Sequence, residues 1–133
     1  MGLLTAVTWT IAALIGVYLL YRWLSAGGLR RQEAKVTRFP VTLLLSHPAL
    51  AAASLACWVA YLLTGRAPLA WLALCGLTVA ALLGFTMFTR WLGGGRHQRR
   101  VTGFPVLAVV LHGVAGVTTF ALLLVTAGIA RVF

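Results

Sequence analysis

The sequence predicts an all-α integral membrane protein, a four-helix bundle made of two tandem repeated helical hairpins. Hydrophobic residues make up 62% of the 133 positions, and the mean hydropathy is +1.00. With one acidic residue in total, such a chain could not keep a water-facing surface around one small core. Four apolar stretches are long enough to cross about 30 Å of hydrocarbon, and the second half of the sequence repeats the first. We expect a single membrane domain over residues 1–133.

The four spans are expected at residues 3–24, 39–63, 68–91 and 104–128. A basic connection follows the first span and no basic segment precedes it, so we expect a retained helix and not a cleaved signal peptide. Phe-Pro-Val opens the second and the fourth span. Proline in the first turn of a helix loses no hydrogen bond, so this segment is a suitable helix start.

Positive charge is concentrated on one side of the expected bundle. The net charge is +10, and nine of the eleven cations fall in or beside the first and third connections: Arg22, Arg30, Arg31, Lys35, Arg38, Arg90, Arg96, Arg99 and Arg100. The positive-inside rule places these connections in the cytoplasm and both termini outside, in a multi-pass protein of the cell membrane. In a soluble protein this charge would suggest nucleic acid, but here it indicates orientation and attraction to anionic lipid. The bilayer is the expected partner.

Tryptophans stand near the span ends. Trp23, Trp71 and Trp91 occupy positions that are typical of an aromatic belt at the membrane interface. We expect them to lie at the level of the lipid headgroups.

An internal repeat extends over most of the chain. IAALIG at 11–16 returns as VAALLG at 79–84, an offset of 68 that also relates RWL at 22–24 to 90–92. After a three-residue deletion the offset is 65, and Phe-Pro-Val and His47 return as Phe-Pro-Val and His112. The repeats run over about 3–63 and 71–128. Because each contains two spans, both have the same orientation, and we expect a pseudo-twofold axis along the membrane normal.

Two histidines are retained in both repeats. His47 and His112 each follow the opening Phe by eight residues, which places them about 12 Å inside the cytoplasmic end of the span. An ionisable group at this depth indicates a functional site. Spans two and four should occupy one diagonal of the bundle, about 12–14 Å across. This gap is too wide for direct ring contact but suits two imidazoles with a haem iron between them, so we predict haem b with both histidines as axial ligands.

Further residues complete the expected cofactor site. They are Gly16, Gly84, Ala51, Gly116, Arg22, Arg90 and Arg38. The four small residues either allow close helix packing or leave room for a flat ligand. The three arginines either pair with the haem propionates or anchor the protein to lipid.

Other interpretations of the histidines stay open. Each could donate a hydrogen bond to a neighbouring helix and only fix packing, or the pair could bind a different ligand. Zinc is disfavoured because no Cys or carboxylate shares their level. The one acid, Glu33, lies in a basic connection, so proton-coupled transport or general-base catalysis inside the membrane is not expected.

Two cysteines flank the short connection between spans two and three. Cys57 and Cys75 could lie at one height, where an oxidising compartment would permit a disulfide. No C-x-x-C motif is present. Two buried free thiols are the favoured interpretation.

The four spans with paired histidines resemble membrane-anchor cytochromes b and cytochrome b561-like bundles. The motifs FPVTLLLSH and FPVLAVVLH are also similar to small uncharacterised four-span proteins of high-GC bacteria. The first resemblance implies axial ligation by His47 and His112, although the second histidine pair of two-haem b561 proteins is missing.

The sequence therefore predicts a b-type haem protein that serves as an electron-transfer or anchoring subunit of a redox complex. We do not expect it to be an enzyme by itself, and other membrane or redox subunits, or further copies of the chain, are the expected partners. One rival is a haem-free structural or accessory subunit. A weaker rival is a small carrier of a hydrophobic or anionic molecule.

Overall fold

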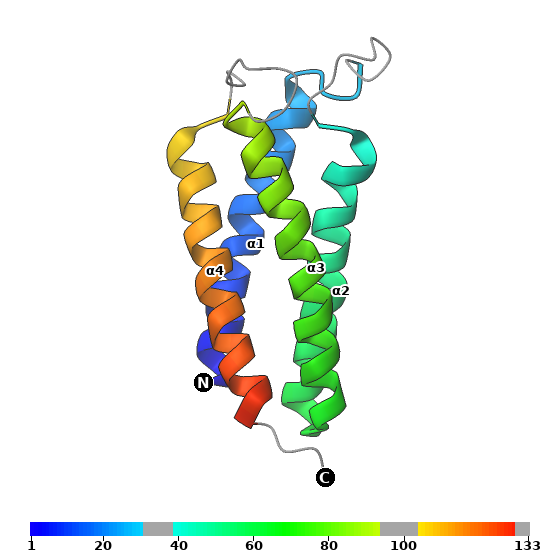
Figure 1. Ribbon diagram of the computed structural model, residues 1–133, viewed down its shortest axis with the longest axis vertical. Helices are drawn as coiled ribbons and strands as arrows, with labels where there is room; N and C mark the ends of the chain where they lie inside the picture. Colours follow the sequence, from blue (N-terminus) through cyan, green and yellow to red (C-terminus); the bar gives the residue numbers. More distant parts are fainter. Residues whose placement is uncertain (31–38, 94–103, 130–133) are drawn as a thin grey trace.

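Four antiparallel α-helices make up a bundle in the computed structural model, which describes residues 1–30, 39–93 and 104–129 (Figure 1). The helices are α1 (Gly2–Ser25), α2 (Val41–Thr64), α3 (Ala67–Trp91) and α4 (Val106–Ile129). Each is long and apolar enough to cross a membrane. The prediction of an all-α bundle with four spans is confirmed, and each helix begins and ends within two residues of the expected span.

The two ends of the bundle differ in how the helices are joined. At one end, α2 stops at Gly65, whose φ of 69° suits a residue without a side chain, and α3 starts directly after Arg66. We call this the turn end. At the other end, Arg22 and Arg90 lie in the last turns of α1 and α3, and Pro40 precedes the first residue of α2. We call this the basic end.

The helices are packed as two close pairs. α2 packs most extensively on α3, and α1 on α4, whereas the α3–α4 and α1–α2 interfaces are smaller. In Figure 1, α1 lies behind α4 and α2 behind α3. α2 and α4 therefore occupy one diagonal of the bundle, as expected, and each close pair joins one helix from each predicted repeat.

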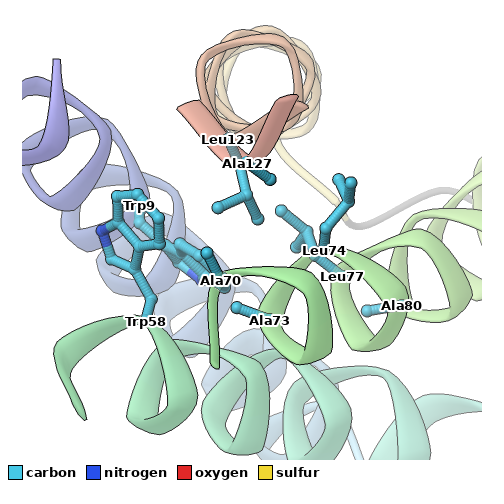
Figure 2. Close-up of a cluster of buried hydrophobic side chains, with 9 residues drawn as sticks. All are labelled: Trp9, Trp58, Ala70, Ala73, Leu74, Leu77, Ala80, Leu123 and Ala127. Atoms are coloured by element: carbon cyan, nitrogen blue, oxygen red, sulfur yellow. The ribbon is translucent and has the colours of Figure 1, made fainter. Parts of the chain in front are cut away.

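Two hydrophobic clusters fill the bundle. The larger lies toward the turn end (Figure 2) and consists of Trp9, Trp58, Ala70, Ala73, Leu74, Leu77, Ala80, Leu123 and Ala127. The smaller lies at the basic end and consists of Trp23, Phe39, Leu44 and Trp91. On α2, His47 falls between the residues that belong to the two clusters. The histidine level therefore separates them.

Two of the three tryptophans of the expected aromatic belt face the interior of the bundle. Trp23 and Trp91 are only 8% and 4% exposed, because both indoles pack into the cluster at the basic end. Trp71, in contrast, is 40% exposed, as a residue of an interfacial belt would be. The bundle thus uses two of its large aromatic side chains to close its own end.

The cysteines are free thiols in the structure, as favoured by the sequence. Cys57 is half-buried, but the prediction of burial is wrong for Cys75, which is exposed. Leu74 and Leu77 form part of the buried face of α3, so Cys75 falls on the outward face of that helix.

Candidate functional site at the histidine pair

His47 and His112 face each other across the diagonal between α2 and α4. Their ring centroids are 5.9 Å apart and the ring planes meet at 73°, an edge-to-face arrangement. The prediction that this gap is too wide for direct contact is wrong. Each imidazole extends inward from its helix, so the two side chains together bridge the space between the backbones.

Each ring is held by a backbone carbonyl of the helix that forms a close pair with its own. The Nδ1 atom of His47 lies 2.7 Å from the carbonyl oxygen of Ala80, and that of His112 lies 2.9 Å from the carbonyl oxygen of Ala12. A carbonyl can only accept, so Nδ1 must carry the proton in both bonds. In a neutral imidazole the other nitrogen, Nε2, then has a free lone pair. Among the described residues, neither Nε2 atom has a hydrogen-bond partner.

Gly84 and Gly16 supply the space in which the rings lie. A Cβ atom on Gly84 would come within 3.0 Å of Cε1 of His47, and one on Gly16 would come within 3.0 Å of Cε1 of His112. The imidazole edges therefore occupy the room left by these glycines. This refines the sequence prediction, which assigned that room to a neighbouring helix or a flat ligand.

On both α1 and α3, the alanine whose carbonyl accepts the histidine hydrogen bond precedes the glycine that contacts the same ring by four residues. Ala80 and Gly84 on α3, like Ala12 and Gly16 on α1, lie one above the other on the same face. Both pairs are repeat-matched in the sequence, but only the structure identifies their contacts. The carbonyl acceptors of the two alanines are functional groups that sequence reasoning missed, because an Ala-x-x-x-Gly spacing predicts close packing without naming what packs there.

A second pair of repeat-matched side chains meets at the basic end. The rings of Phe39 and Phe104 also have centroids 5.9 Å apart, at an interplanar angle of 76°. Each precedes its histidine by eight residues along the chain. This aromatic contact therefore lies between the histidines and the basic end of the bundle.

The remaining predicted site residues are only partly brought together. Ala51 packs against the larger hydrophobic cluster. A Cβ atom on Gly116 would meet no atom within 4 Å, so there is open space beside this residue. Arg22 and Arg90 lie at the basic end, in the last turns of their helices. Arg38 lies outside the described residues.

The arrangement offers two imidazole nitrogens as ligands. The described residues contain no group of three or more His, Cys, Asp or Glu side chains that could hold a metal ion. A bare metal ion would therefore lack most of its coordination sphere here. No protein-family model, curated protein or solved structure matches the chain. A proposal about function therefore has to rest on the geometry of the histidine site.

Proposed function

We propose that the protein is an integral membrane b-type haem protein in which His47 and His112 are the two axial ligands. In this proposal it serves as an electron-transfer or anchoring subunit of a redox complex. The observation that carries the proposal is the pair of facing imidazoles on diagonal helices. Each has Nδ1 bonded to a carbonyl, and within the described part of the chain its Nε2 has no hydrogen-bond partner.

The separation of the rings fits two ligands of one iron. Two imidazoles that bind a metal from opposite sides at about 2 Å keep their centroids about 6 Å apart. The observed separation is 5.9 Å. The centroid separation is therefore compatible with two imidazole ligands of one metal.

The number of ligands also favours haem over a bare ion. A porphyrin supplies four nitrogen ligands of its own, so the protein has to provide only the two axial ones. The described part of the chain offers two histidines and no larger group of metal ligands. A haem with two imidazole ligands exchanges single electrons and leaves no position open for oxygen.

The chain's own groups orient the ligands. The carbonyls of Ala80 and Ala12 fix the tautomer and the direction of each ring, the role that backbone acceptors play behind metal-bound histidines. A Cβ on Gly116, one helical turn beyond His112, would meet no atom within 4 Å. Arg22 and Arg90, at the basic end, are the cations we assign to the propionates.

The proposal includes the repeat and its pseudo-twofold axis. Three repeat-matched positions make the same contacts twice: the histidines, the alanine carbonyls and the glycines. Reciprocal contacts of this kind support a symmetric site on an axis between the two halves. They also account for the retention of these residues in both repeats.

A second candidate function is a haem-free accessory subunit of a membrane complex. The observation in its favour is that the rings already touch edge to face and each already makes an interhelical hydrogen bond. Such contacts can serve helix association alone. The two candidates differ in whether the Nε2 lone pairs are used.

A reduced-minus-oxidised visible spectrum of the purified protein, expressed with ample haem, distinguishes them. The haem proposal predicts a sharp b-type signal that is lost in His47→Ala and in His112→Ala. His97→Ala, which changes the third histidine of the sequence, is the matched control and should keep the signal. A colourless wild-type protein that is folded by circular dichroism would refute the haem proposal and leave the accessory function.

A further inference from the structure

A groove of about 440 Å³ runs along the outer surface of the α1–α4 pair. Leu14, Ile15 and Tyr18 of α1 line one wall, and Leu107, Ala108 and Leu111 of α4 line the other. It is a shallow, open depression and not an enclosed cavity. A long apolar chain could lie along it while its outer side stays in contact with the surroundings.

This groove opens sideways, toward the surroundings of the bundle. Leu14 and Leu107 are 66% and 70% exposed, so they lie on the surface that a membrane-spanning bundle presents to lipid. An occupant must therefore enter from the bilayer. Its buried part must be apolar, because apolar side chains form nearly the whole lining.

Polar groups occur where the groove approaches the basic end. Tyr18 carries the one side-chain hydroxyl of the lining and is 43% exposed. Arg22 follows four residues later, so it lies on the same face of α1, in the last turn of the helix. An apolar slot that leads to a phenol and then to a guanidinium matches a molecule with a hydrocarbon body and an anionic head.

The corresponding seam between α2 and α3 has different side chains. At the repeat-matched positions, Thr86 replaces Tyr18, Leu43 replaces Ala108 and Ser46 replaces Leu111. The first change removes the phenol, the second places a larger side chain where the groove has a methyl group, and the third adds a hydroxyl to the lining. Arg90 matches Arg22. The α2–α3 seam therefore has the corresponding positive charge but lacks the phenol and the small side chain of the groove.

We propose that the groove binds one anionic phospholipid, with an acyl chain between α1 and α4 and the phosphate at Tyr18 and Arg22. Basic sites between transmembrane helices are suited to anionic headgroups. The groove contains neither histidine, but Arg22 is also one of the two cations that we assign to the haem propionates, so the two proposed sites share this residue. The lipid proposal itself does not require haem.

Native mass spectrometry of the full-length protein tests the assignment. The protein is delipidated in detergent and then titrated with phosphatidylglycerol, or with phosphatidylcholine of the same acyl chains. We expect one phosphatidylglycerol per chain to be retained preferentially. Arg22→Gln should weaken this binding about five-fold, the effect expected for one cation near a headgroup, and Ala108→Phe should abolish it by filling the groove.

Arg90→Gln is the matched control for the charge and should leave the first lipid in place. If Arg22→Gln and Arg90→Gln weakened phosphatidylglycerol binding equally, the lipid would be attracted by the charge of the basic end in general. That result would overturn the assignment. Equal retention of the two lipids, or retention of phosphatidylglycerol by a folded Ala108→Phe variant, would also overturn it. Excess inorganic phosphate should not displace the lipid, since the acyl chain contributes to binding.

Discussion

At the scale of single residues, the histidine site depends on glycines that lack a side chain where a ring must fit. The Cβ of an alanine at 84 or 16 would press on Cε1 of the adjacent imidazole at 3.0 Å. Ring and acceptor carbonyl are held by the same pair of helices, so the ring can yield only by lengthening its Nδ1 hydrogen bond or by separating the helices. An alanine at either position would therefore have to displace the adjacent ring by a few tenths of an ångström.

We predict that Gly84→Ala and Gly16→Ala each lower the stability of the bundle by about 1–3 kcal/mol, the usual cost of overpacking. Thermal or SDS-induced unfolding in detergent micelles measures this change. Nitrogen NMR of the histidines should also show that the ring facing the substituted glycine has lost its Nδ1–H bond to carbonyl, while the other ring has kept it.

Gly113→Ala is the matched control for these variants. A Cβ at Gly113 would meet no atom within 4 Å. The substitution therefore changes only the helix propensity, which is higher for alanine, and the stability of the bundle should rise by up to about 1 kcal/mol. A fall in stability at Gly113 equal to that at Gly84 would show that the cost does not come from the imidazole contact.

At the scale of helices, each close pair contains a contact of small or hydroxyl-bearing residues near the middle of the bundle. In the α1–α4 pair, the hydroxyl oxygens of Thr119 and Thr8 lie 3.0 Å apart. The single hydroxyl proton of Thr119 is shared between Thr8 and the carbonyl of Ala115, which lies at 2.7 Å. In the α2–α3 pair, Ser54 lies against Gly76, which has no side chain to keep the helices apart. These positions are repeat-matched, 54 with 119 and 8 with 76. One pair uses a hydroxyl bond, whereas the other uses close backbone approach.

We predict that Thr119→Val weakens the α1–α4 pair by about 0.6 kcal/mol, the average for an interhelical hydrogen bond in a membrane protein. Valine has nearly the shape of threonine but lacks its hydroxyl. Thr119 is only 1% exposed, so water cannot replace the lost bond. A double-mutant cycle with Thr8→Val, followed by unfolding in micelles, isolates the bond. Additive effects of the two substitutions would contradict a direct interaction between the hydroxyls.

Much of this element-scale picture could be predicted from the sequence, but some of it could not. Hydropathy places all four helices because a span of hydrocarbon fixes their minimum length. The predicted repeat, which matches His47 to His112, leads us to expect both residues at one level on diagonal helices. The ring contact was missed because its distance depends on how far the side chains reach inward. The partners of Gly16 and Gly84 were missed because small residues look alike in sequence whether a helix, a ring or a ligand fills the space.

At the scale of the whole molecule, the distribution of charge between the two ends predicts the orientation in the membrane. Nine of the eleven cations lie in the last turns of α1 and α3 or in the sequence that follows these helices. Arg66 is the cation of the short turn between α2 and α3. Insertion retains Lys- and Arg-rich connections in the cytoplasm. The basic end should therefore face the cytoplasm, and the turn end should face outward.

Single cysteines placed at the two ends test this orientation in a Cys57→Ser, Cys75→Ser background. Arg66→Cys, at an exposed position of the turn end, should react with a membrane-impermeant maleimide in intact cells. Ser25→Cys, exposed at the end of α1 near the basic end, should react only after the membrane is permeabilised. The four helices alternate in direction, so the α1–α2 and α3–α4 connections lie on the same side of the membrane. Labelling at Ser25→Cys therefore reports the side of both connections. The opposite labelling pattern would place that end outside the cytoplasm, and the proposed lipid site would then have to select its ligand from the other leaflet.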